Sequence, residues 1–74
     1  MQYLNDNWAL NELAAAESQV SEINARLSRQ HQLVEQLAVQ GHDVTSAKIV
    51  LDSLLLSLFL AAEDRHRLRT MNFR

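Results

Sequence analysis

The side chains that could do chemistry in this sequence are three histidines, a run of arginines and scattered carboxylates. His31, His42 and His66 are spread over the 74 residues, and no two of them have the H-x-x-x-H spacing that lets one helix hold a metal ion. Cysteine is absent, so thiolate ligands and disulfides are excluded. We therefore expect no metal site and no cofactor.

Catalysis has little support in the sequence. The single glycine rules out a glycine-rich phosphate loop, and no nucleophile motif is present. Glu17, Glu22 and Glu35 fall on predicted solvent-facing sides of a helix, the usual place for glutamate. We expect a protein that is not an enzyme.

The basic tail Arg65, Arg67 and Arg69 could contact phosphates. However, cations at the carboxyl end of a helix are favoured by the helix dipole alone. The net charge of −2, from 7 basic and 9 acidic residues, gives no general attraction to nucleic acid. Nucleic-acid binding is therefore kept only as a third alternative, and the arginines are retained as possible contacts to a protein partner.

The sequence predicts a short link between two helices at Gly41, His42 and Asp43. Glycine readily ends a helix in the left-handed conformation, and Asp43 can accept hydrogen bonds from the free N–H groups of Thr45 or Ser46. The alanine- and leucine-rich composition without proline favours helix on both sides. The sequence predicts one domain over 1–74, all-α, with helices over about 5–40 and 44–70, the first capped by Asn5 or Asp6.

Both predicted helices carry an apolar seam with alternating spacings of three and four. The first seam is Leu13, Ala16, Val20, Ile23, Leu27, Gln30, Val34 and Leu37, and the second is Val44, Ala47, Leu51, Leu54, Leu58, Ala61, Arg65 and Leu68. In an antiparallel hairpin turning at His42, facing residues have numbers that add up to about 84. The seams satisfy this rule, which also places Arg67 opposite Glu17. Gln30 is the polar member expected to fix the register.

The second helix is apolar on more sides than its neighbour can cover. Beyond its seam it carries Ile49, Leu55, Leu56, Phe59 and Leu60. Leaving such side chains in water forfeits roughly 1.5–3 kcal/mol each. We therefore expect a homodimer in which the second helices face inward and form a four-helix bundle. The alternative is a subunit of a hetero-complex that binds a partner helix through the same residues.

A second apolar group gathers where the two termini should meet. It comprises Tyr3, Leu4, Trp8, Leu10, Met71 and Phe73. These residues can cap the end of the bundle core or, because Trp and Tyr are favoured in binding hot spots, contact a partner.

The apolar stretch from Ile49 to Ala62 is shorter than the roughly 20 residues needed to span a bilayer. The amino terminus lacks a basic region followed by an apolar run, so no secretory signal is expected. These observations predict a cytoplasmic protein without a membrane span.

The pattern Arg29-Gln30-x-x-Leu33-Val34-x-x-Leu37, then Gly41-His42-Asp43 and Ala47, resembles a group of small uncharacterised bacterial proteins. Their closing motif, [HD]-R-x-R-L, is similar to Asp64-Arg65-His66-Arg67-Leu68. The resemblance implies a cytoplasmic helical hairpin and no particular activity. The second helix of that group is also leucine-rich but usually has several charged residues, whereas here the apolar run from Leu54 to Leu60 is almost unbroken. The overall prediction is a structural or interaction module, namely an adaptor, scaffold or regulator, with nucleic-acid-associated regulation by the arginine tail as the third possibility.

Overall fold

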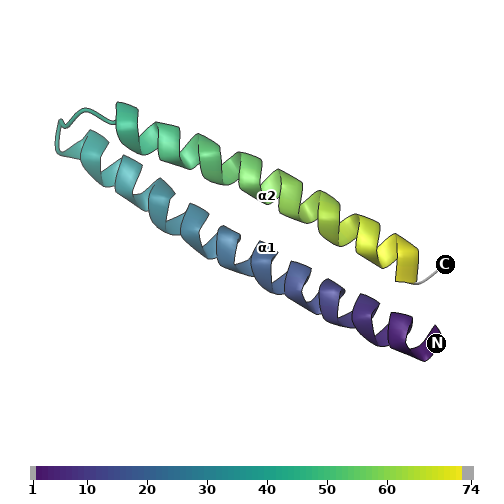
Figure 1. Ribbon diagram of the computed structural model, residues 1–74. Coiled ribbons are helices and arrows are strands. Elements are labelled where there is room, and N and C mark those ends of the chain that lie inside the picture. Colours follow the sequence, from purple (N-terminus) through teal and green to yellow (C-terminus); the bar gives the residue numbers. More distant parts are fainter. Residues whose placement is uncertain (1, 73–74) are drawn as a thin grey trace.

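The computed structural model describes residues 2–72, and the side chains of residues 8–71. Helix α1, Gln2–Val39, and helix α2, Thr45–Asn72, run antiparallel side by side along their lengths (Figure 1). The prediction of an all-α antiparallel hairpin with packed helices is confirmed.

The end of α1 is fixed by Gly41, whose φ of 80° lies in the left-handed region. The His42 N–H donates to the Leu37 carbonyl at 2.9 Å, and the Gly41 N–H donates to the Ala38 carbonyl at 3.1 Å. These two bonds form a Schellman motif, which satisfies carbonyls that the helix leaves free at its carboxyl end.

The start of α2 is fixed by Asp43, as predicted. One carboxylate oxygen accepts hydrogen bonds from the Thr45 N–H at 2.9 Å and from the Thr45 hydroxyl at 2.7 Å. The Val44 carbonyl accepts the first bond of the helical ladder, from the Lys48 N–H. The short link between the two motifs turns the chain through a half circle, so α2 returns along α1 (Figure 1).

The predicted cap of α1 at Asn5 or Asp6 is wrong, because α1 begins at Gln2 and continues through both residues. An asparagine or aspartate inside a helix costs at most about 0.7 kcal/mol relative to alanine, which is too little to stop the helix. The side chains of residues 2–7 lie outside the described part.

Both predicted seams form the interface between the helices. Every seam position is buried or half-buried in the structure. Leu13, Ala16 and Leu68 form one buried cluster, and Val20, Ile23 and Ala61 form another, flanked by Leu27 and Leu58. Ala9, buried at 8% exposure, extends the seam of α1 by one more position. The antiparallel alignment read from the sequence is thereby confirmed at these two clusters.

The core of the hairpin is thin. Half of its buried residues are alanines (Ala9, Ala16, Ala47 and Ala61), and no described side chain is fully buried. The chain forms a rod of 60 × 15 × 14 Å with a radius of gyration of 17.0 Å. A compact chain of this length would have a radius of gyration of about 11 Å, so the hairpin has much surface for its mass.

Candidate interaction surface

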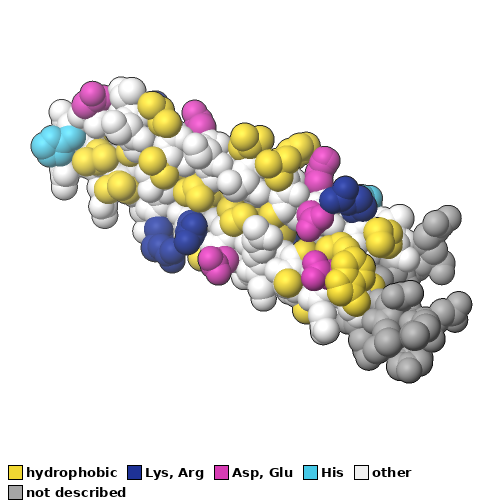
Figure 2. Space-filling view, in the orientation of Figure 1, with side chains coloured by type: hydrophobic (Ala, Val, Ile, Leu, Met, Phe, Trp, Pro, Cys, Tyr) yellow, Lys and Arg dark blue, Asp and Glu magenta, His cyan; other side chains and the backbone are white. Residues whose placement is uncertain are grey.

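The surface of α2 turned away from α1 is apolar. Ile49, Leu56, Phe59 and Leu60, which we call the outer face, are 60%, 61%, 60% and 57% exposed. Leu55, also predicted for the interface, is 49% exposed at the flank of this face. Hydrophobic side chains reach the surface along α2 in the space-filling view (Figure 2). All the residues predicted for the interface are thus exposed in the single chain.

The periodicity of α2 explains this exposure. Ile49, Leu56 and Glu63 recur every seven residues. In the heptad repeat they occupy the position opposite the two seam positions, so they point directly away from α1. Phe59 and Leu60 lie on either side of that line. The intramolecular neighbour covers only the seam, and α2 remains apolar on its opposite side.

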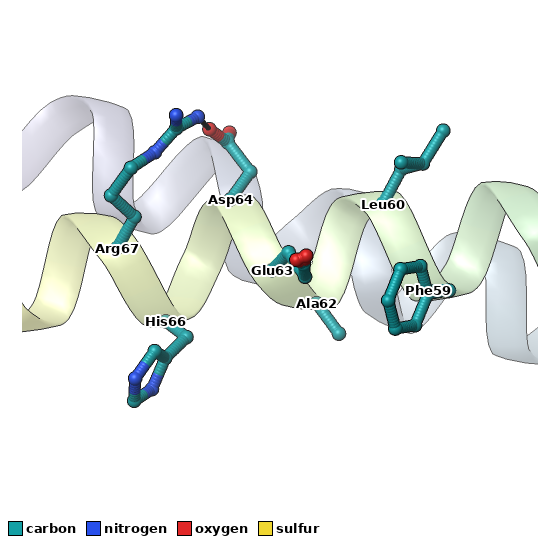
Figure 3. A pocket seen from close by; sticks show the side chains of 7 residues that line it. All are labelled: Phe59, Leu60, Ala62, Glu63, Asp64, His66 and Arg67. Carbon is teal, nitrogen blue, oxygen red and sulfur yellow. Dashed lines mark hydrogen bonds and ion pairs between the residues drawn. The ribbon is translucent and has the colours of Figure 1, made fainter.

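A shallow groove continues the outer face toward the carboxyl end of α2 (Figure 3). Leu60, Asp64 and Arg67 stand along one side of the helix, while Phe59, Ala62 and His66 stand along the other, with Glu63 between the two rows. All of these residues come from α2. The groove is therefore an open channel between two ridges of one helix, the kind of surface into which the ridge of another helix packs.

Charged groups border the outer face without covering it. The Arg67 guanidinium donates to the Asp64 carboxylate at 2.8 Å, within the same helix. Asp52 is exposed and has no ion pair with any residue in the described part of the chain. Among the described residues, the outer face thus carries Asp52 without an ion pair toward its amino end. Toward its carboxyl end it carries Glu63, also without an ion pair, and Arg67, which is paired with Asp64.

The predicted pairing of Arg67 with Glu17 is wrong, because Arg69 takes that place. The Arg69 guanidinium donates to the Glu17 carboxylate at 2.7 Å across the two helices. Arg65 is half-buried at a seam position. Arg67 and Arg69 are thus engaged with carboxylates of the same chain.

The amino end of α1 and the carboxyl end of α2 lie at the same end of the hairpin (Figure 1). Among the predicted terminal apolar residues, Trp8, Leu10 and Met71 are 56%, 50% and 56% exposed. The side chains of Tyr3 and Leu4, and all of Phe73, lie outside the described residues. The three described members do not form a buried cap in the single chain.

The residues considered for metal binding do not converge. No cluster of three or more histidine, aspartate or glutamate residues that could hold a metal ion occurs within residues 2–72. Glu63 and His66 have the E-x-x-H spacing of a possible ligand pair, but no third ligand joins them within the described residues. His31 contacts Glu35 at 2.9 Å on α1, and His42 belongs to the joint between the helices.

Helix α2 is longer than its central apolar stretch suggests. The segment Thr45–Met71, 27 residues, is long and apolar enough to cross a membrane by length and composition, and only 6% of its most apolar window is buried. The expectation of no membrane span therefore does not follow from length. One such helix is weak evidence for a span, because the central helix of a water-soluble assembly passes the same test.

Three comparisons with known proteins were made, and none of them found a match. No family model, no curated protein and no solved structure matches the chain. The functional argument accordingly depends on the surface of α2.

Proposed function

We propose that this protein is a non-enzymatic interaction module that acts as a homodimeric helical bundle, with the two α2 helices at the centre. The observation that carries the proposal is the outer face, four large apolar side chains that are each more than half exposed. Exposed apolar patches of this kind mark interaction sites.

The accessible surface area of the single chain is larger than that of an ordinary folded monomer, as expected for one subunit of a dimer. A folded monomer of 8.5 kDa ordinarily exposes about 4,700 Å². This chain exposes 5781 Å². The difference, on the order of 1,000 Å², is close to the roughly 800 Å² that each partner contributes to a standard protein interface.

The free energy that burial of the outer face would contribute also favours a dimer. Complete burial of a leucine, isoleucine or phenylalanine contributes roughly 1.5–3 kcal/mol, and each of these four side chains has about half of its surface still to bury. Dimerisation would therefore contribute about 5 kcal/mol per chain, similar to the whole stability of a small domain. A hairpin whose own core is half alanine depends on such a contribution.

A protein neighbour accounts for the outer face better than lipid does. If α2 crossed a bilayer within the hairpin, α1 would lie at the same depth with Glu22, Arg26 and Arg29. Each charged side chain at the centre of a bilayer costs at least about 2.5–3.5 kcal/mol. A membrane span would require the hairpin to open and would also bury Lys48 and Asp52 of α2.

Sedimentation equilibrium of the pure chain tests the proposal. At about 10–50 µM we expect twice the chain mass of 8.5 kDa, and dissociation of the Leu56→Glu variant to monomers, because a carboxylate would enter the apolar contact. The matched control is Leu33→Glu on α1, where the leucine is 42% exposed. A well-folded wild-type monomer at these concentrations would overturn the proposal.

The same measurement separates a homodimer from the subunit of a hetero-complex. A chain that dimerises alone buries the outer face against itself. A chain that is poorly helical or aggregated alone requires a different protein against α2. For the homodimer we propose the task of an adaptor, a scaffold or a regulator in the cytoplasm.

A further inference from the structure

We infer that the second copy docks antiparallel on the outer face, with Leu56 of each copy beside Leu60 of the other. This inference rests on the proposed function, since it specifies the orientation and the register of the same contact. It is carried by the spacing of the outer residues, by the charges that border them and by the groove at the end of α2.

The spacing defines a second seam on α2. Ile49, Ser53, Leu56, Leu60, Glu63 and Arg67 alternate in steps of four and three, and all six side chains are exposed. This is the same alternation as in the seam that packs against α1, and it is the pattern of a helix with a coiled-coil partner. Helix α2 therefore presents two opposite seams, of which α1 fills one.

One antiparallel register of the second seam brings two wholly apolar layers next to each other. Two identical layers of Leu56 against Leu60 then lie at the centre, on either side of the two-fold axis. Ser53 falls opposite Glu63 in the next layers, where the serine hydroxyl can donate to the carboxylate. Ile49 falls against the aliphatic stem of Arg67 at the two ends.

The charges favour antiparallel over parallel docking. In a parallel dimer the two seam residues Glu63 and Arg67 would each face the same residue of the other copy, and like charges placed opposite one another are unfavourable. In the antiparallel dimer the Asp52 end of each copy lies over the His66–Arg67 end of the other. Asp52, which has no ion pair in the described part of the single chain, then comes within reach of Arg67, whose guanidinium also contacts Asp64 of its own helix.

The groove provides the matching shape. Leu60, Glu63, Asp64 and Arg67 line part of it, and their spacing of three, four and seven residues is that of the hole in knobs-into-holes packing. In the proposed register the small Ser53 of the other copy occupies this hole. A small side chain suits a hole whose rim carries the ion pair of Arg67 and Asp64 (Figure 3).

Engineered cysteines test the orientation cleanly because the chain has none of its own. We would mix Ser53→Cys with an affinity-tagged Glu63→Cys under mild oxidation, and repeat the mixture with Leu56→Cys and Leu60→Cys. The first pair leaves every outer leucine in place, and Asn24→Cys on α1 is the control. Disulfides require Cβ atoms about 3.5–4.5 Å apart, so only facing positions should link efficiently.

Antiparallel docking predicts mixed disulfides, tagged to untagged, in both mixtures. Disulfides only between identical variants would establish a parallel dimer and overturn the inference while leaving the homodimer intact. A dimer in sedimentation that links at none of these positions would overturn both the face and the register. A monomer that binds vesicles of zwitterionic phospholipid would overturn the proposed function itself in favour of lipid.

Charge exchange supplies a second readout that does not depend on disulfide geometry. Asp52→Arg and Arg67→Asp should each weaken dimerisation about two- to fivefold, and the double variant should restore it, because each copy then regains an opposite charge across the contact. In a parallel dimer residue 52 of one copy lies about 22 Å along the helix from residue 67 of the other, so the double variant would restore nothing. Failure of the restoration would contradict the proposed orientation.

Discussion

The Gln30 side chain of α1 donates a hydrogen bond from Nε2 to the backbone carbonyl of Ala47 in α2, at 2.9 Å. Gln30 is the polar member of the seam and is half-buried. A side chain that binds the backbone of the other helix at one point ties the two helices to one alignment. This contact gives a physical basis to the register role predicted for Gln30.

The Gln30→Leu variant should melt at the same temperature as the wild type or slightly above it, while its helices become less strictly aligned. The leucine gains about 1 kcal/mol from apolar burial, and the lost hydrogen bond costs about 0.5–1.5 kcal/mol. Thermal unfolding by circular dichroism measures the first effect, and amide exchange near Ala47 measures the second. Gln36→Leu, at an exposed position of α1, is the control. A fall of several degrees only in the Gln30 variant would contradict a packing role for the seam position.

The Gly41→Ala variant should lose about 1–2 kcal/mol of stability from backbone strain alone. Gly41 has a φ of 80°, and a Cβ built on it would meet no atom within 4 Å, so no steric clash contributes. Gly41→Asn should lose less, because asparagine tolerates the left-handed region. Chemical synthesis with D-alanine at position 41 should restore or exceed wild-type stability in urea unfolding. An equal loss with L- and D-alanine would show that the conformation is not what matters.

Stability should fall in acid through Asp43. The hydrogen bonds from the Thr45 hydroxyl and N–H hold the pKa of the Asp43 carboxyl below its ordinary value of 3.8. Because the folded-state pKa is the lower one, the contribution is present above pH 3.8 and is lost as the pH falls through the folded-state pKa. Urea unfolding at a fixed chain concentration and at several pH values measures it. Asp43→Asn should flatten this part of the profile, whereas Gln36→Asn, a control on α1 that exchanges no titratable group, should leave it unchanged.

Truncation of two isoleucines, one between the helices and one on the outer face, should change the stability of the protein in different ways. Ile23 is 8% exposed between the helices, and Ile23→Ala should cost about 2–4 kcal/mol at every chain concentration. Ile49 is 60% exposed on the outer face, so Ile49→Ala in a monomer would change stability only by the small helix preference of alanine. We expect a clear loss for Ile49→Ala at high concentration that disappears on dilution. Concentration-independent melting of both variants would count against the dimer.

The sequence allowed the hairpin and its contact surface to be predicted because both depend on local rules. Gly41 and Asp43 act on their immediate neighbours, and the seam positions follow from the helical repeat. Both were therefore readable without knowledge of the tertiary structure. The alternation of three and four even placed Arg65, a charged residue, at a half-buried position.

Other features were beyond such rules. Counting residues gives the height of each Cα atom along the hairpin, and this height placed Arg67 opposite Glu17. An arginine side chain is longer than one helical turn, however, and the guanidinium that contacts Glu17 is that of Arg69. The start of α1 was misplaced because Asn5 and Asp6 are favourable caps and yet only mildly unfavourable inside a helix. Whether the outer face meets protein or lipid depends on molecules outside the chain.

The rod shape of the hairpin affects how its mass must be measured. A particle four times as long as it is wide, 60 Å against 15 Å, diffuses more slowly than a sphere of equal mass. On a gel-filtration column calibrated with globular standards, a single hairpin would elute early, at an apparent mass above its own. Column retention alone would therefore report a false dimer, and side-by-side dimerisation would shift elution by less than a doubling of mass suggests.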